Sequence, residues 1–160
     1  MFLVGMFLIC CLLLPAKPQA AGDARDVGSV LSAAEAVFQN MSQAAYPALW
    51  RGLSVQSRRS IIKNVRKAIG KGGFDYADER IGADFAAGGD LARDYWTNYV
   101  LQFEPRLVLE ESKWTMGEIK KDTAEIIIRY RKSDRDAILK MFREEGAWKV
   151  GLEETFSTRK

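Results

Sequence analysis

Alternating apolar residues in the last third of the chain, residues 113–156, restrict the possible fold more than any other feature. Three runs follow one another through short polar turns, and in each run every second residue is apolar. The residues expected to share a face are Trp114, Met116, Ala124, Ile126, Ile128, Tyr130, Trp148, Val150 and Leu152. A period of two residues is typical of strands with one buried side. The pattern predicts an antiparallel meander packed against other elements.

The opposite face of this meander also carries apolar residues. Ile127, Ile138 and Phe142 fall on it. Apolar residues on both faces indicate that part of the second face is covered as well. A homodimer formed through that face is one hypothesis for the covering partner.

Helical periodicity precedes the strands. Apolar residues recur at spacings of three and four in residues 26–41, in a short segment after Pro47, in residues 55–69 and in residues 90–103. Ser54 and Asp90 are typical N-caps for the last two helices, and Gly70 is a natural stop after residue 69. Residues 74–87 fit a short helix or an ordered loop, and strands are expected from Leu107 onward. These elements predict an α+β protein in which N-terminal helices pack into a curved antiparallel sheet.

The first residues resemble an export signal. Residues 2–14 are uninterruptedly apolar and are followed by Pro15. The run is short for a transmembrane helix, which needs about 20 residues. We therefore expect a cleaved signal at residues 1–21, a single α+β domain at residues 22–160, and a periplasmic or secreted location. An uncleaved membrane anchor formed by residues 2–14 is the alternative.

The residue types exclude several kinds of chemistry. The chain has no histidine, and its two cysteines, Cys10 and Cys11, both lie in the apolar run. Histidine-based metal sites and Ser-His triads are therefore excluded, and cleavage would remove any thiol. We expect no metal and no cofactor. The net charge of +3 does not predict a nucleic-acid partner, and a membrane is expected to be contacted only through an uncleaved N-terminal segment.

The helix at residues 55–69 has a basic side that carries Arg59, Lys63, Arg66 and Lys67. It fits a patch for anionic lipid headgroups or an acidic partner, but ordinary surface helices have the same pattern, and an ordinary solvated face is the favoured interpretation. Arg58 falls within the apolar stripe of the same helix. Its side chain either extends out to solvent or points into a pocket as an anion-binding group.

The order of helices and strands, the Gly146-Ala147-Trp148-Lys149-Val150 ending and the export signal together resemble the nuclear-transport-factor-2-like superfamily. The resemblance covers most of residues 27–156. It implies an α+β cone whose apolar pocket serves small ligands, cofactor-free lyase or isomerase chemistry, or dimerisation. From the apolar faces, the residues expected to line such a pocket, with Arg58 added, are Trp50, Tyr95, Trp96, Tyr99, Met116, Ile128, Met141 and Trp148. The same side chains could instead simply fill the core.

Three functions remain open on this basis. The first is a non-catalytic module that binds an apolar ligand, and the second is a homodimeric interaction module of the cell envelope. The third is a lyase or isomerase that uses an Asp/Tyr pair, for which Asp94 with Tyr95 and Asp78 with Tyr76 are the candidates. Helical geometry directs Asp94 away from the aromatic face of its helix. The sequence favours the non-catalytic binding module.

Overall fold

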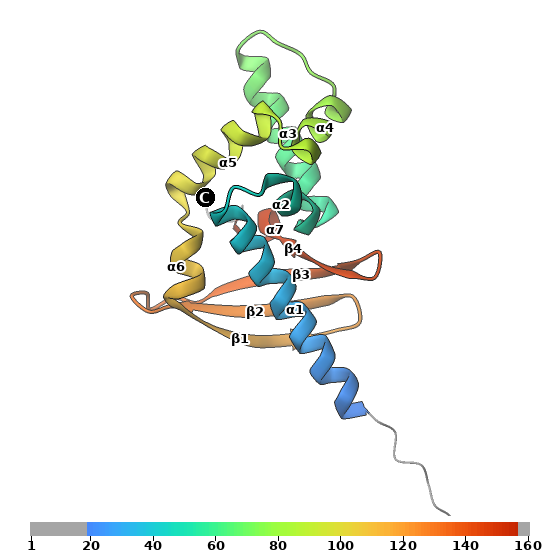
Figure 1. The fold of residues 1–160 in the computed structure, drawn as a ribbon, viewed down its shortest axis with the longest axis vertical. Helices are drawn as coiled ribbons and strands as arrows, with labels where there is room; N and C mark the ends of the chain where they lie inside the picture. The colour runs from blue at the N-terminus through green and yellow to red at the C-terminus, as the bar shows by residue number, and fades with distance from the viewer. Residues whose placement is uncertain (1–18, 157–160) are drawn as a thin grey trace, which may run out of the picture.

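The computed structural model of the chain describes residues 19–156, so the apolar run at residues 2–14 lies outside the described residues. Six helices come first: α1 (Gln19–Ser42), α2 (Tyr46–Gly52), α3 (Val55–Lys71), α4 (Asp78–Ala87), α5 (Asp90–Gln102) and α6 (Pro105–Glu110). The strands β1 (Ser112–Ile119), β2 (Thr123–Tyr130), β3 (Ala137–Glu144) and β4 (Ala147–Gly151) follow, and then the short helix α7 (Leu152–Phe156). The prediction of helices packed on an antiparallel meander is confirmed (Figure 1).

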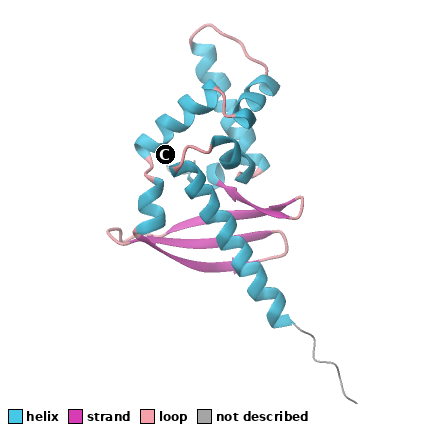
Figure 2. Cartoon of the chain, viewed as in Figure 1, coloured by secondary structure: helices cyan, strands magenta, loops and turns pink. Residues whose placement is uncertain are grey.

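The four strands are antiparallel and lie in the order β1-β2-β3-β4. Their pairing aligns the buried positions, so that Ile126 lies opposite Leu139 and Met141 opposite Val150. Helix α1 crosses the sheet, and most of the other helices gather beyond β4 (Figure 2). On the opposite face Ile138 is 49% exposed. The core therefore lies on one side of the sheet, between the strands and the helices.

Two segments expected as strands are helical. Residues 105–110 form α6. Pro105 prevents the preceding helix from continuing, and its fixed φ angle also suits the first turn of a new helix. The indole Nε1 of Trp114 donates to the carbonyl of Val108 at 2.9 Å and ties this turn to β1. Leu152, expected at the end of the last strand, is buried as the first residue of α7.

The N-cap prediction is confirmed for α3 and wrong for α5. The Ser54 hydroxyl accepts a hydrogen bond from the backbone N–H of Ser57. For α5 the N-cap is Gly89, and the carboxylate of Asp84 in α4 accepts from the N–H of Ala92 at 2.9 Å. Gly88 has φ 69°, a left-handed conformation that glycine adopts without strain, and it turns the chain tightly enough to bring Asp84 to α5.

Helix α3 differs from its prediction at both ends. Val55, expected on the buried side, is exposed, and its N–H binds the carboxylate of Glu144. Ile62, Val65 and Ile69 of the predicted apolar side are half-buried against the core, and the fully buried residues of the helix are Ser57 and Ile61. The helix also continues past Gly70 to Lys71, because the capping bonds form at the next glycine, Gly72.

Candidate functional site

A groove lies between the α5–α6 corner and the inner face of β2 and β3. One cavity of about 800 Å³ has an apolar wall formed by Phe103, Leu107, Val108, Ile128, Ala137 and Phe156. A second cavity, of about 620 Å³, lies along α5 beside Tyr95, Asn98 and Tyr99. Both cavities are partly open, and both use Gln102, Phe103 and Phe156. Because the two cavities share these residues, we refer to them together as the α5–α6 groove.

The aromatic wall of the groove comes from two helices. Tyr95, Tyr99 and Phe103 follow one another every four residues, so they lie on one side of α5 and its C-cap. Ring centroids are 6.2 Å apart for Tyr95 and Tyr99 and 5.7 Å for Tyr99 and Phe103. Phe156 of α7 continues the row at 5.3 Å from Phe103. These separations are those of packed aromatic pairs, so the wall is an ordered surface.

A carboxylate lies close to this wall. Burial raises the pKa of Tyr95 and Tyr99, and the negative charge of Glu153 raises both further. Burial also raises the pKa of Glu153 itself, and the neighbouring charge of Glu154 adds to that effect. The two phenols therefore remain protonated at neutral pH, where they can donate hydrogen bonds to a ligand.

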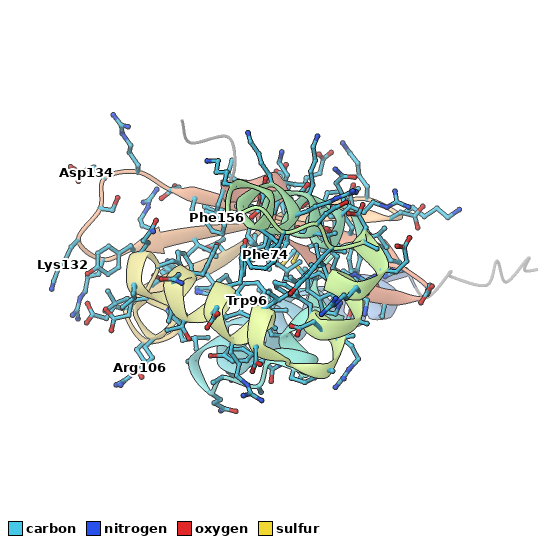
Figure 3. The ribbon with its side chains drawn as sticks, turned by 90° about the horizontal axis from the view of Figure 1, so that it is seen from above. Phe74, Trp96, Arg106, Lys132, Asp134 and Phe156 are labelled. Atoms are coloured by element: carbon cyan, nitrogen blue, oxygen red, sulfur yellow. The ribbon has the colours of Figure 1, made fainter. Side chains whose placement is uncertain are left out.

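The far edge of the groove is polar and comes from the β2–β3 hairpin, marked by Lys132 and Asp134 in Figure 3. Arg129 donates two hydrogen bonds of 2.6 Å to Asp136, and these bonds lower the pKa of that carboxyl. Arg135, the residue before Asp136, also lines the larger cavity. Asp136 is already paired with Arg129, and among residues 19–156 no ion pair involves the Arg135 guanidinium, so this cation can meet a ligand.

The N-terminus of α3 fixes the position of α7. The hydroxyl of Ser54 donates to one carboxylate oxygen of Glu154 at 2.6 Å, and the hydroxyl of Ser57 donates to the other. Ser57 also accepts from the N–H of Glu153 at 3.0 Å. Both serines are buried. We call this set of contacts the serine clasp; it holds α7, the helix that supplies Phe156 to the groove and carries Glu153 close to Tyr95 and Tyr99.

Three of the residues predicted to line a pocket, Tyr95, Tyr99 and Ile128, do line the groove. The others line neither cavity: Trp50, Trp96, Met141 and Trp148 are buried in the core, Met116 is half-buried on β1, and Arg58 is half-buried in the first turn of α3. Trp96 packs behind the aromatic wall, 4.9 Å from Tyr95. It supports the wall rather than facing the groove.

The sequence alone does not identify Phe103 and Phe156 as groove residues, or Glu153 as the carboxylate close to Tyr95 and Tyr99. The spacing of Phe103 from Tyr99 was a usable signal, because it repeats the four-residue interval of the tyrosines. The alternation that predicts Leu152 to be in a strand conceals Glu153 and Phe156, which follow it in a helix. The acidic pair directly after Leu152 is typical of a helix first turn and could have indicated α7.

The two carboxylates named for Asp/Tyr chemistry do not reach the groove. Asp78 forms an ion pair with Arg66 at 3.3 Å, and both side chains are largely exposed. Asp94 is exposed, and its α5 carbonyl accepts a hydrogen bond from Asn98. Glu153, by contrast, is close enough to Tyr95 and Tyr99 to raise the pKa of both.

Within residues 19–156, no cluster of three or more His, Cys, Asp or Glu side chains is placed to hold a metal ion. None of the helices in this range combines the length and the apolar character needed to cross a membrane. Comparisons with protein-family models, curated proteins and solved structures gave no match to this chain.

Proposed function

We propose that this chain is an exported, non-catalytic binding protein whose α5–α6 groove holds a small ligand with an apolar or aromatic body. The observation that carries the proposal is the pair of neighbouring cavities, which share Gln102, Phe103 and Phe156 in their linings. The larger cavity, at about 800 Å³, lies within the range of roughly 300–1,000 Å³ that is common for small-molecule sites.

The polar groups of the groove suit a ligand with hydrogen-bonding ends. Tyr95 and Tyr99 offer phenol donors at one end, and Arg135 offers a cation at the other. The apolar wall between them would be covered by the ligand body, which is the usual division of roles in such sites. Membership of the nuclear-transport-factor-2-like superfamily is part of this proposal, because that superfamily encloses an apolar pocket between helices and sheet.

Native mass spectrometry of the protein purified gently from its own host tests the proposal. We expect added mass of roughly a few hundred daltons that disappears on denaturation. The same spectrum tests export, because a mass lacking about twenty N-terminal residues shows a removed signal and the full-length mass shows a retained one.

A variant that fills the cavity tests whether the added mass is bound in the groove. Ala137→Phe places a ring in the larger cavity and should remove the added mass. Ala147→Phe makes the same change at an exposed position of β4 and should keep it. Added mass that survives Ala137→Phe, or no added mass in the wild-type protein, would contradict the proposal.

Acid–base catalysis in the same groove is a second candidate function. It is favoured by Glu153, a half-buried carboxylate whose pKa is raised by burial and which lies close to two tyrosines of the groove; a carboxylate with a raised pKa is the type of group that can accept and return a proton. Once a ligand is identified, incubation with the wild-type protein shows whether it is converted. Conversion that is lost in Glu153→Gln while the ligand still binds would establish the catalytic function, and an unchanged ligand would support binding alone.

A homodimer is a further candidate assembly. On the outer face of the sheet Ile127 pairs with Ile138, whose side chain is 49% exposed. A second copy of the chain could cover this pair. Sedimentation of the purified protein at high concentration tests the idea, and a monomer there would exclude it.

A further inference from the structure

Helix α3 concentrates positive charge. It carries six lysine and arginine residues and no acidic residue. The whole chain has 24 basic and 21 acidic residues, so 18 basic residues face 21 acidic ones outside this helix. The rest of the chain is therefore net negative by three charges. The small overall charge conceals a strongly basic element on an otherwise acidic protein.

Most of this charge is not neutralised within the fold. In the part of the chain that the structure describes, Arg66 is the one cation of α3 in an ion pair, with Asp75 and Asp78. Four others recur every four residues along the helix and are exposed: Arg59, Lys63, Lys67 and Lys71. Like charges at this spacing repel one another and oppose helix formation, and no acidic side chain within residues 19–156 forms an ion pair with these four to reduce the repulsion. An anionic partner would relieve all four together.

An exposed aromatic residue follows the basic helix directly. Phe74 is 65% exposed, and it is joined to Lys71 through Gly72 and Gly73. It lies at the end of the molecule that faces the viewer in Figure 3, beyond the end of α3. In Figure 1 this end is opposite to the start of α1. The surface is built from residues of the range 55–74 and not from residues 2–14, the segment through which the sequence alone predicts membrane contact.

We propose that the exposed side of α3, together with Phe74, is a docking surface for a lipid bilayer that contains anionic headgroups. The lysines are long and flexible, and they can follow headgroup phosphates without a matched recess. The Phe74 ring can enter the interface between headgroups and acyl chains, where aromatic side chains are favourable. A folded acidic protein would instead need a surface complementary to a protruding ring. This proposal does not depend on the function of the groove.

Vesicle co-sedimentation of the full chain tests the proposal. The protein should sediment with vesicles of phosphatidylcholine and phosphatidylglycerol more than with vesicles of phosphatidylcholine alone, and added salt should weaken the difference. The triple variant Lys63→Gln, Lys67→Gln and Lys71→Gln should bind the anionic vesicles about a hundredfold more weakly. Phe74→Ala should also weaken binding, and the loss should persist at high salt because it is apolar.

A second triple variant separates a docking surface from net charge. Lys113→Gln, Lys121→Gln and Lys132→Gln removes the same charge from exposed positions on β1 and on the loops that follow β1 and β2, and it should leave binding unchanged. Equal losses in the two triple variants would overturn the proposal. So would equal binding to neutral and anionic vesicles, or no binding to vesicles. Retention of the protein on polyglutamate or duplex DNA without any binding to vesicles would assign the basic side to an acidic macromolecule instead.

Discussion

Glu153 lies where the serine clasp meets the aromatic wall, and its chemistry follows from that position. Its backbone N–H is bound by Ser57, while its side chain is close enough to Tyr95 and Tyr99 to raise the pKa of both phenols. Partial burial then works against the charge of the carboxylate itself. Desolvation makes the Glu153 carboxylate less stable as an anion, and for the same reason it makes the carboxylate bind a proton more readily.

This leads to a pH-dependence prediction for Glu153. The pKa of the folded state is raised above the unfolded value near 4.5, so the folded protein binds the proton more tightly than the unfolded chain. Its contribution to stability is complete below the unfolded pKa and is lost as the pH rises through the folded pKa. Glu153→Gln should therefore raise the free energy of unfolding at neutral pH and remove this part of the pH dependence.

Urea unfolding at a series of pH values measures the effect. Glu35→Gln, at an exposed position of α1, serves as the control and should follow the wild-type profile. A Glu153→Gln profile parallel to that of the wild type between about pH 4 and pH 8 would contradict the prediction.

For single residues, the spacing in the sequence predicts which aromatic side chains share one side of a helix, but it does not predict which of them line a cavity. Tyr95 and Tyr99 were identified by spacing, and both line the groove. Trp96 has the same aromatic character but is fully buried behind them. The difference depends on how α5 is rotated against α4 and the sheet, and that rotation is decided by packing over the whole core.

Among the secondary-structure elements, the α4–α5 junction gives the sharpest test. The sequence nominates Asp90 as the cap of α5, whereas the structure uses Asp84. A side chain added at Gly89 would collide with Asp84, because its Cβ would lie 2.2 Å from a carboxylate oxygen. The junction therefore depends on a glycine and on an acid from the preceding helix.

Asp84→Ala should destabilise the protein by about 1 kcal/mol, because it leaves the N–H of Ala92 without its acceptor. Asp90→Ala should have a much smaller effect, because the Asp90 side chain is 95% exposed and its ion pair with Arg93 is weak. Chemical denaturation of the two variants compares them directly. A larger loss of stability for Asp90→Ala than for Asp84→Ala would show that Asp90, the residue predicted from the sequence, is the cap.

Periodicity identified the longer elements and missed the shorter ones. Helices α1, α3 and α5 extend over enough turns for a three-to-four spacing to be visible, and β2 alternates over its full length. Helices α6 and α7 have 6 and 5 residues, so they contain too few periods to be told from strands. Because α7 supplies Phe156 to the groove and Glu153 beside its tyrosines, these two residues could not be predicted from the periodicity of the sequence.

For the whole molecule, helices and sheet share one core. Leu53, which follows α2, forms a parallel bridge with Val150 of β4. Arg143 of β3 donates to Asp26 of α1 at 2.5 Å, and its guanidinium lies 4.6 Å from the ring centre of Trp148. These contacts join the first helix to the last two strands. We therefore expect the helices and the sheet to unfold together.

Tryptophan fluorescence and far-ultraviolet circular dichroism should give coincident unfolding curves in urea. The four tryptophans report on both layers, since Trp50 and Trp96 lie in helices and Trp114 and Trp148 lie in strands. Two separated transitions would show that the helices and the sheet are independent folding units and would contradict the expected single domain.

The serine clasp also sets an order of events during synthesis. Ser54 and Ser57 are translated early, but their partner Glu154 lies about one hundred residues later in the chain. Until that residue leaves the ribosome, the two hydroxyls have no carboxylate to bind, and the strands that complete the core are also missing. The apolar sides of the nascent helices therefore stay exposed until the strands have been synthesised. During this interval the chain has the greatest tendency to aggregate and the greatest need for a chaperone.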